Sequence, residues 1–256
     1  MSTKLSERMT ALAAMVTPGS RLADVGCDHA YIPIALCGEG RIPSALAMDV
    51  KSGPLIRAQE HIKASGWDDR IETRMSDGIE ALQEDEADTV MIAGMGGLLI
   101  KRILTEHAIP ASVTELILAP QSEVSDVRSC IRELGFSITD EDMVLEDGKY
   151  YPIIKALRGQ EKGTDSPAND LPEPESLDSD EASRREMEDA FGPILLKRHH
   201  PVLHRWLEKE RDVTDGILAR LDSELALAPD SSHLIDRCEE MRHRKHLITV
   251  ALESYQ

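Results

Sequence analysis

Two aspartates and a glycine stand close together in the run ADVGCDHAY at residues 23–31. The apolar residues before them predict a strand at 21–25, and an open α/β sheet binds its ligand at the carboxyl ends of its strands. A dinucleotide site would require GxGxxG, but Asp28 occupies the second glycine position and no third glycine follows Gly26. Because Asp24 and Asp28 would repel phosphate groups, the run favours a cationic ligand without phosphates. A simple turn in which Asp28 caps the next helix is the alternative.

Further acids and glycines follow the next predicted strands in order. Asp49 ends the second strand, where an acid can accept hydrogen bonds from both hydroxyl groups of a ribose, and Asp77 follows the third, where it could accept one from an adenine amino group. The glycines after the fourth strand leave room for a base to approach. S-Adenosylmethionine (SAM) is a phosphate-free cation that contains an adenosine, so these sites together favour it. The predicted cofactor-binding residues are Asp24, Gly26, Cys27, Asp49, Val50, Asp77, Gly78, Ala93, Gly94, Met95 and Gly96.

Composition argues against several other classes of protein. The 256 residues include only two Trp, four Tyr and two Phe, too few for a sheet that stacks RNA bases on aromatic rings. The four cysteines form no CxxC pair and no basic-then-apolar leader is recognisable, which predicts a reduced, cytoplasmic protein. No apolar stretch approaches the roughly 20 residues of a membrane span. The histidines of the C-terminal tail lack an acid or cysteine to complete a ligand set, so we expect no metal.

The elements that must position these residues alternate along residues 1–160. Short apolar runs separated by stretches of helical periodicity indicate a parallel sheet with helices on both faces. Two strands around the turn 146–149 then close the sheet as an antiparallel hairpin. This α/β order is typical of class I SAM-dependent methyltransferases, which are Rossmann-like. The predicted strands are 21–25, 44–48, 71–75, 89–93, 115–119, 136–145 and 150–157, and the predicted helices are 4–15, 30–36, 53–65, 98–106 and 123–134.

Two segments of different composition follow. Residues 161–183 contain eight acids, one lysine and three prolines, which predicts a disordered acidic linker. In residues 184–256, apolar residues recur about every seven positions over 201–228 and 232–254, which predicts an antiparallel helical hairpin with a coiled-coil seam. Basic clusters at 197–205 and 242–246 give this tail a local cationic face, although the whole chain carries a net charge of −18. Packing or dimerisation is the alternative role for the hairpin.

Several motifs closely resemble the bacterial TrmK family of tRNA (adenine-N1)-methyltransferases, which modify adenine 22. They are ADVGCDHAYIP at 23–33, IAGMGG at 92–97 and LILAPQ at 116–121, and the segments at 5–8 and 191–196 are also similar. The resemblance implies a Rossmann-like SAM domain and a C-terminal coiled-coil domain that helps to hold tRNA. It also implies transfer of the SAM methyl group to adenine N1 by in-line displacement.

The implied reaction depends on positioning more than on a strong base, because adenine N1 is unprotonated at neutral pH. The methylated base is cationic, so we expect Asp28 to stabilise its charge, with His29 and Tyr31 orienting Asp28 or the base. We also expect the hairpin to bring its two basic clusters together as a phosphate-contacting face. The predicted tRNA-binding residues are Lys197, Arg198, Arg205, Arg242, Arg244 and Lys245.

Two alternatives to tRNA methylation stay open. The domain could methylate another RNA, a protein or a small molecule, and the basic clusters are the feature that favours a large RNA. It could also be a catalytically silent SAM-binding scaffold whose hairpin recruits a partner. We expect no membrane partner, and a monomer.

Overall fold

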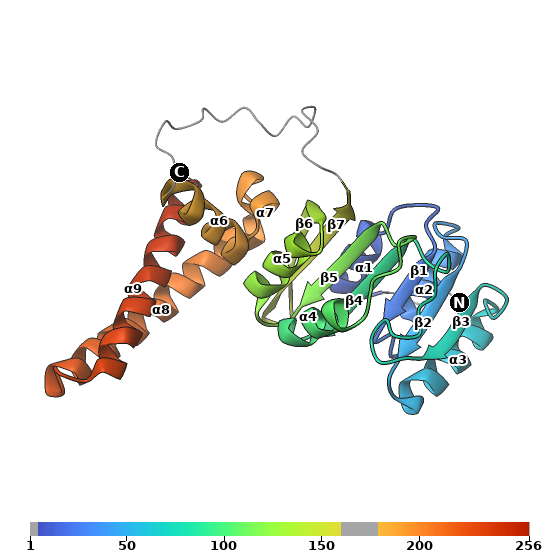
Figure 1. The fold of residues 1–256 in the computed structure, drawn as a ribbon, viewed down its shortest axis with the longest axis horizontal. Coiled ribbons are helices and arrows are strands. Elements are labelled where there is room, and N and C mark those ends of the chain that lie inside the picture. The colour runs from blue at the N-terminus through green and yellow to red at the C-terminus, as the bar shows by residue number, and fades with distance from the viewer. Residues whose placement is uncertain (1–4, 160–178, 256) are drawn as a thin grey trace. The chain divides into compact units, whose positions relative to one another are not determined.

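The computed structural model describes residues 5–159 and 179–255. Along the chain they divide into two compact units, with residues 5–159 in the first and 179–255 in the second (Figure 1). The first unit contains a mixed sheet with its covering helices, and the second is helical.

A seven-stranded sheet forms the centre of the first unit. Its order is β3-β2-β1-β4-β5-β7-β6, with the first five strands parallel and β7 antiparallel between β5 and β6. Every residue of β1 and β5 is buried, as expected for parallel strands covered on both faces. The predicted fold class, a parallel sheet closed by an antiparallel hairpin, is confirmed. The strands are β1 (Leu22–Val25), β2 (Ala45–Asp49), β3 (Ile71–Met75), β4 (Thr89–Met95), β5 (Glu115–Pro120), β6 (Phe136–Glu146) and β7 (Lys149–Arg158).

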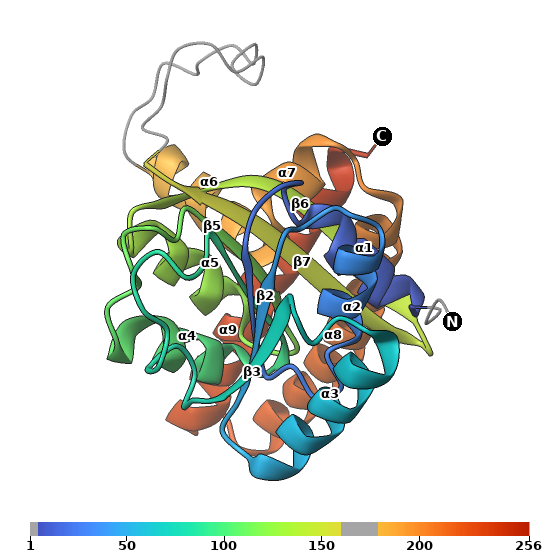
Figure 2. The same cartoon turned by 90° about the vertical axis from the view of Figure 1, so that its right-hand side faces the viewer.

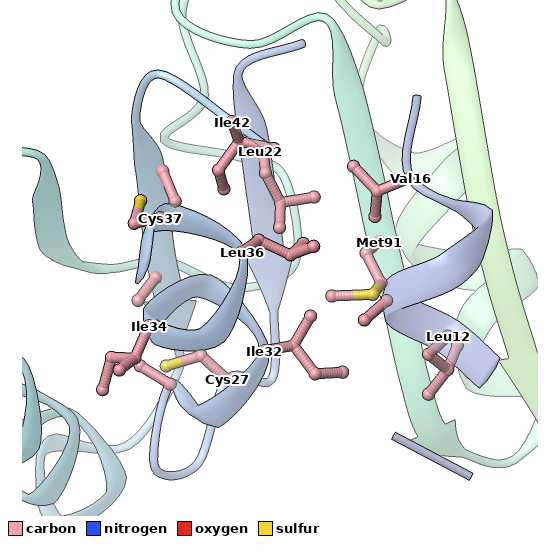
Figure 3. Close-up of a cluster of buried hydrophobic side chains, with 14 of the residues drawn as sticks. Leu12, Val16, Leu22, Cys27, Ile32, Ile34, Leu36, Cys37, Ile42 and Met91 are labelled. Carbon is pink, nitrogen blue, oxygen red and sulfur yellow. The ribbon is translucent and has the colours of Figure 1, made fainter. Parts of the chain in front are cut away.

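Helices cover both faces of this sheet (Figure 2). Side chains alternate along β1, so that Leu22 packs into one hydrophobic cluster and Ala23 into the other. Figure 3 shows the first cluster, in which Leu36 points toward Leu22 and the Cys27 side chain lies among apolar neighbours. The first cluster takes side chains from α1 (Glu7–Met15), α2 (Tyr31–Gly38) and α3 (Ser52–Ser65), and the second from α4 (Gly97–Glu106) and α5 (Val124–Glu133).

The connection from β3 to β4 differs from the other links between consecutive parallel strands, each of which contains a helix. Residues 76–88 contain turns and no helix. Arg74 holds this connection: its guanidinium donates to Glu86 Oε2 at 2.6 Å and to the Ala81 carbonyl at 3.0 Å. The Ser76 hydroxyl donates to the Gly78 carbonyl at 2.9 Å. These bonds satisfy polar groups of the loop without helical hydrogen bonds, and none of the predicted helices falls in this stretch.

The second unit contains the predicted antiparallel hairpin. Its two long helices are α8 (Pro201–Leu227) and α9 (Ser232–Glu253). Leu218 and Leu221 of α8 pack against Cys238 and Met241 of α9, which form the apolar seam between the helices. No helix in the two described ranges is long and apolar enough to cross a membrane.

Two helices that the sequence analysis did not predict precede the hairpin. They are α6 (Ser179–Phe191) and α7 (Pro193–Lys197). Because α6 begins at Ser179, the last five residues of the predicted linker are helical. The preceding part of that prediction, 161–178, lies outside the described residues. The acids and few apolar residues at the start of α6 gave it the same composition as the segment before it, which is why its beginning was missed.

Candidate cofactor and methyl-transfer site

The turn after β1 contains three residues with left-handed backbone, of which Gly26 is the glycine. Gly26 has φ +78°, and a Cβ at this position would collide with the Met95 side chain from the neighbouring strand β4. Asp28 and Ala30 also have left-handed φ values of 43° and 54°, which are uncommon for residues with side chains. The turn therefore has a fixed shape that the sequence could indicate only at Gly26.

Asp24 is a buried acid with the properties of a cation-binding group. Its residue surface is 8% exposed, and burial together with the nearby Asp49 carboxylate raises the pKa of Asp24 to about 7. No residue of the described ranges donates a hydrogen bond to its side chain. A buried carboxyl group without a partner is costly once ionised, so a cation bound beside it would be strongly favoured.

Asp49 and Val50 follow at the end of β2. Asp49 Oδ1 accepts a hydrogen bond from the Lys51 backbone N–H at 2.8 Å, which orients the carboxylate and leaves its second oxygen for a ligand. Val50 is 56% exposed, so its apolar side chain is available for contact with a flat ring.

Asp77 and Gly78 form the next part of the predicted site. Arg102 of α4 donates to Asp77 Oδ1 at 2.8 Å and to Oδ2 at 3.2 Å, and this pairing lowers the pKa of Asp77. A Cβ on Gly78 would lie 2.7 Å from Ile103 Cγ2, so only glycine fits where the loop passes α4. Sequence reasoning missed Arg102, which gave no signal beyond its place on an exposed helix face.

The glycines after β4 are held against the end of β5. Gly97 N–H donates to the Ser122 carbonyl at 3.1 Å, and a Cβ on Gly97 would collide with that same carbonyl. The Gln121 N–H donates to the Met95 carbonyl at 2.9 Å. Gly94, with φ +77°, is exposed. Gly94 and Gly96 thus present backbone without side chains of their own, beside the side chains of Gln121 and Ser122.

Three of the predicted cofactor-binding residues have side chains that pack against other parts of the protein. The Cys27 side chain is buried among the apolar residues of the first cluster, and its N–H donates to the Met48 carbonyl at 3.1 Å. The Met95 side chain lies against Gly26. Ala93 is half-buried and packs against the same first cluster. Any cofactor contact of Cys27 would have to use its backbone.

The three predicted catalytic residues lie together on the turn, joined by two residues of α3. Arg57 Nη2 donates to Asp28 Oδ1 at 2.8 Å, and His29 Nε2 lies 3.6 Å from the other oxygen of Asp28. The rings of His29, Tyr31 and His61 stand nearly parallel, with centroids 5.0–5.3 Å apart. Sequence reasoning missed Arg57 and His61, although their four-residue spacing on a predicted helix was a signal that they share one face.

The basic residues of the tail are divided between exposed positions and interhelical ion pairs. Arg242, Arg244 and Lys245 of α9 pair with acids of α8, at N–O distances of 2.6–2.8 Å; these acids are Asp222, Glu210 and Asp215 respectively. The cluster at 242–246 therefore lies against the middle of α8 and not at its start, so the expectation that the two clusters meet is wrong. Lys197, Arg198 and Arg205 are exposed.

These features together fit SAM. One edge of the sheet carries the buried Asp24, the orienting Asp49 and the open glycines after β4, which suit a cation, a ribose and a closely approaching base respectively. Among the described side chains no group of three potential metal ligands occurs.

Comparison with known proteins agrees with this geometry. Residues 5–154 match a family model described as a methyltransferase domain. The solved structure of Streptococcus pneumoniae Sp1610 is 31% identical, covers 97% of this chain and 100% of its own, and superposes with a TM-score of 0.78. The chain belongs to the TrmK family. The resemblance predicted from the motifs is thus confirmed.

Further TrmK relatives match this chain over different shares of their own length. The crystal structure of Bacillus subtilis TrmK, an m1A22 tRNA methyltransferase, is 28% identical, covers 97% of this chain and 99% of its own, and has a TM-score of 0.80. In sequence, the tRNA (adenine(22)-N(1))-methyltransferase of B. subtilis is 34% identical over 157 residues, which span 61% of this chain and 66% of that relative. Sp1610 has also been solved with S-adenosyl-L-methionine, at 30% identity to this chain.

Proposed function

We propose that this chain transfers a methyl group from SAM to N1 of adenine 22 in tRNA. The observation that carries the proposal is the unpartnered, buried Asp24 beside Asp49 at the sheet edge of a TrmK-family fold. The activity named for the B. subtilis relative supplies the base and the position. Action on tRNA would place the reaction in the cytoplasm, and the proposal needs only a monomer.

The cofactor-holding roles follow from the geometry. Asp24 would face the positive charge of the cofactor, Asp49 would accept hydrogen bonds from the ribose hydroxyls, and Asp77 would accept one from the adenine amino group. Val50 would cover the adenine ring. When bound, SAM supplies a methyl group that passes to the lone pair of adenine N1 while the carbon–sulfur bond breaks and its electrons stay on sulfur.

Asp28 would supply the negative charge that stabilises the methylated base. N1-methylation leaves the adenine with a positive charge, which is relieved when the exocyclic amine loses a proton. Asp28 is exposed, and Arg57 holds one of its oxygens at 2.8 Å, so the other oxygen can face the base. A carboxylate fixed in this way stabilises the developing charge without reorganising during the reaction. His29, 3.6 Å from Asp28, and Tyr31 would orient it.

Substrate binding is assigned to the exposed cations of the tail. Lys197, Arg198 and Arg205 are exposed and can be reached by phosphates. The three basic residues of α9 are paired with acids of α8 and would have to leave these partners before binding a phosphate. The tail therefore contributes to tRNA binding mainly through the start of α8 and the residues before it.

A labelling experiment tests this function against its alternatives. The chain would be incubated with tritiated SAM and, separately, with unmodified total tRNA, ribosomal RNA and a protein extract. Label confined to tRNA is the expected result. Label in another fraction would identify a different methylation substrate, and SAM binding with no label in any fraction would identify a silent scaffold.

A further inference from the structure

The side of α3 that faces residues 28–31 carries Arg57, which holds Asp28, and His61, which has had no role in the reaction so far. Arg57 and His61 are four residues apart, so they lie one above the other on this helix. Arg57 contacts Asp28, and His61 contacts the rings of His29 and Tyr31. A single helix thus touches the three side chains on which the proposed chemistry depends.

The turn that these residues contact does not have an ordinary relaxed backbone. Asp28 and Ala30 both hold left-handed φ values, at 43° and 54°. Each such residue costs on the order of 1 kcal/mol and persists only where its surroundings hold it. Within the turn itself, the Ala30 N–H donates to the Cys27 carbonyl at 2.8 Å. The other side-chain contacts that restrain Asp28, His29 and Tyr31 come from Arg57 and His61 of α3.

His61 exerts its restraint through the face of its ring. Its ring plane lies 22° from that of His29 and 28° from that of Tyr31, with centroids 5.0 and 5.3 Å away. The Nδ1 atoms of His29 and His61 are both buried and have no hydrogen-bond partner in the described part of the chain. Neither Nδ1 anchors its ring, so His61 contacts His29 and Tyr31 through stacking, while His29 Nε2 also lies 3.6 Å from Asp28.

We propose that His61 is a positioning residue for methyl transfer, whose flat ring holds His29 and Tyr31, and through them Asp28, in the arrangement that receives the target base. This inference rests on the proposed function. It requires a flat aromatic ring at position 61 and does not require the acid–base chemistry of an imidazole. An aromatic substitute should therefore serve, and an aliphatic one of similar volume should not.

The matched variants are His61→Phe and His61→Leu, with Gln59→Leu, an exposed position on the same helix, as control. Single-turnover methyl transfer to tRNA would be measured beside the SAM dissociation constant and the melting temperature. We expect His61→Leu to slow transfer at least about tenfold, because small misplacements of catalytic groups are this costly, with SAM affinity unchanged. His61→Phe and Gln59→Leu should retain most of the rate.

Amide hydrogen exchange at residues 28–31 provides a readout that does not depend on activity. Faster exchange in His61→Leu, with protection kept in His61→Phe, is the expected pattern. The inference is overturned if His61→Leu transfers methyl groups as fast as the parent, or if both variants lose rate and protection equally. A purely structural role would instead lower the melting temperature and leave the rate per folded molecule unchanged. A parent protein that labels no tRNA would overturn the proposed function, while the exchange pattern would still decide the role of His61.

Discussion

The Asp24 carboxyl group is buried beside the carboxylate of Asp49, and this arrangement raises the pKa of Asp24 to about 7. The charge that attracts a cationic cofactor is therefore present only as the pH rises through that value. Binding of SAM and the stability of the protein should respond to pH in opposite directions, since both depend on the ionisation of this one group.

We expect SAM to bind more tightly at pH 8 than at pH 6, by about fivefold to tenfold for a group that ionises near pH 7. Calorimetry in buffers of matched ionic strength would measure the dissociation constants. Asp24→Asn should bind weakly at both values and lose most of the pH dependence. A parent protein whose affinity stays flat over this range would remove Asp24 from the cofactor site.

The same group should weaken the folded state at high pH. In the unfolded chain an aspartate loses its proton near pH 4, whereas Asp24 keeps it in the folded chain until about pH 7. Its contribution to the free energy of unfolding is therefore lost as the pH rises from about 4 to about 7. Asp24→Asn should melt at a higher temperature than the parent at pH 8, with a smaller difference at pH 4. Equal melting temperatures at pH 8 would contradict this.

Asp49→Ala should weaken SAM binding by about tenfold to a hundredfold, because two ribose hydroxyls would lose a charged acceptor worth roughly 1.5–3 kcal/mol. Glu60→Ala, which removes the same charge from an exposed position on α3, is the control and should leave affinity unchanged. NAD should bind to neither protein. If the two variants bind SAM equally well, Asp49 does not contact the cofactor.

Asp28→Asn should slow single-turnover methyl transfer by about tenfold to a hundredfold, because the developing charge on the base loses its carboxylate. SAM affinity should change little, since Asp24 and Asp49 remain. Glu39→Gln, an exposed acid just after α2, is the matched control. A rate for Asp28→Asn equal to that of the control would show that Asp28 does not act on the base.

The salt dependence of tRNA binding distinguishes the exposed cations of the tail from those that are paired. Replacing Lys197 and Arg205 by Gln should reduce the slope of log affinity against log salt by somewhat less than one unit for each lost contact. Replacing Arg242 and Arg244 should reduce it less, because each already pairs with an acid of α8. A larger change in the second pair would show that these ion pairs open for tRNA. Unaltered slopes in both would place the tRNA surface elsewhere.

The parts of the site that the sequence predicted are those fixed by local backbone. Gly26 requires a left-handed φ, and Asp49 and Gly94 follow buried apolar runs, so residue type and position along the chain were enough to place them at one sheet edge. The parallel sheet followed from the alternation of apolar runs and helical stretches, and the closing hairpin from the two strands around the turn 146–149. The bounds of most elements differ from the prediction by three residues or fewer, because apolar periodicity marks the middle of an element better than its ends.

The missed parts depend on contacts between elements. Arg57, His61 and Arg102 lie on helix faces that look solvent-exposed in sequence, and only the packing of α3 and α4 beside the loops gives them partners. The pairing of Arg244 with Glu210 depends on the register of two helices, which heptad spacing alone does not set.

The measurement that tests the central claim most directly is the position of the new methyl group. An unmodified tRNA with adenine at position 22 and a variant with guanine there would each be incubated with the protein and SAM. Nucleoside mass spectrometry and primer extension would then locate any modification. The account predicts 1-methyladenosine at position 22 of the first tRNA and no methyl group on the second. Equal methylation of both tRNAs, or no modification at position 22 despite SAM binding, would contradict it.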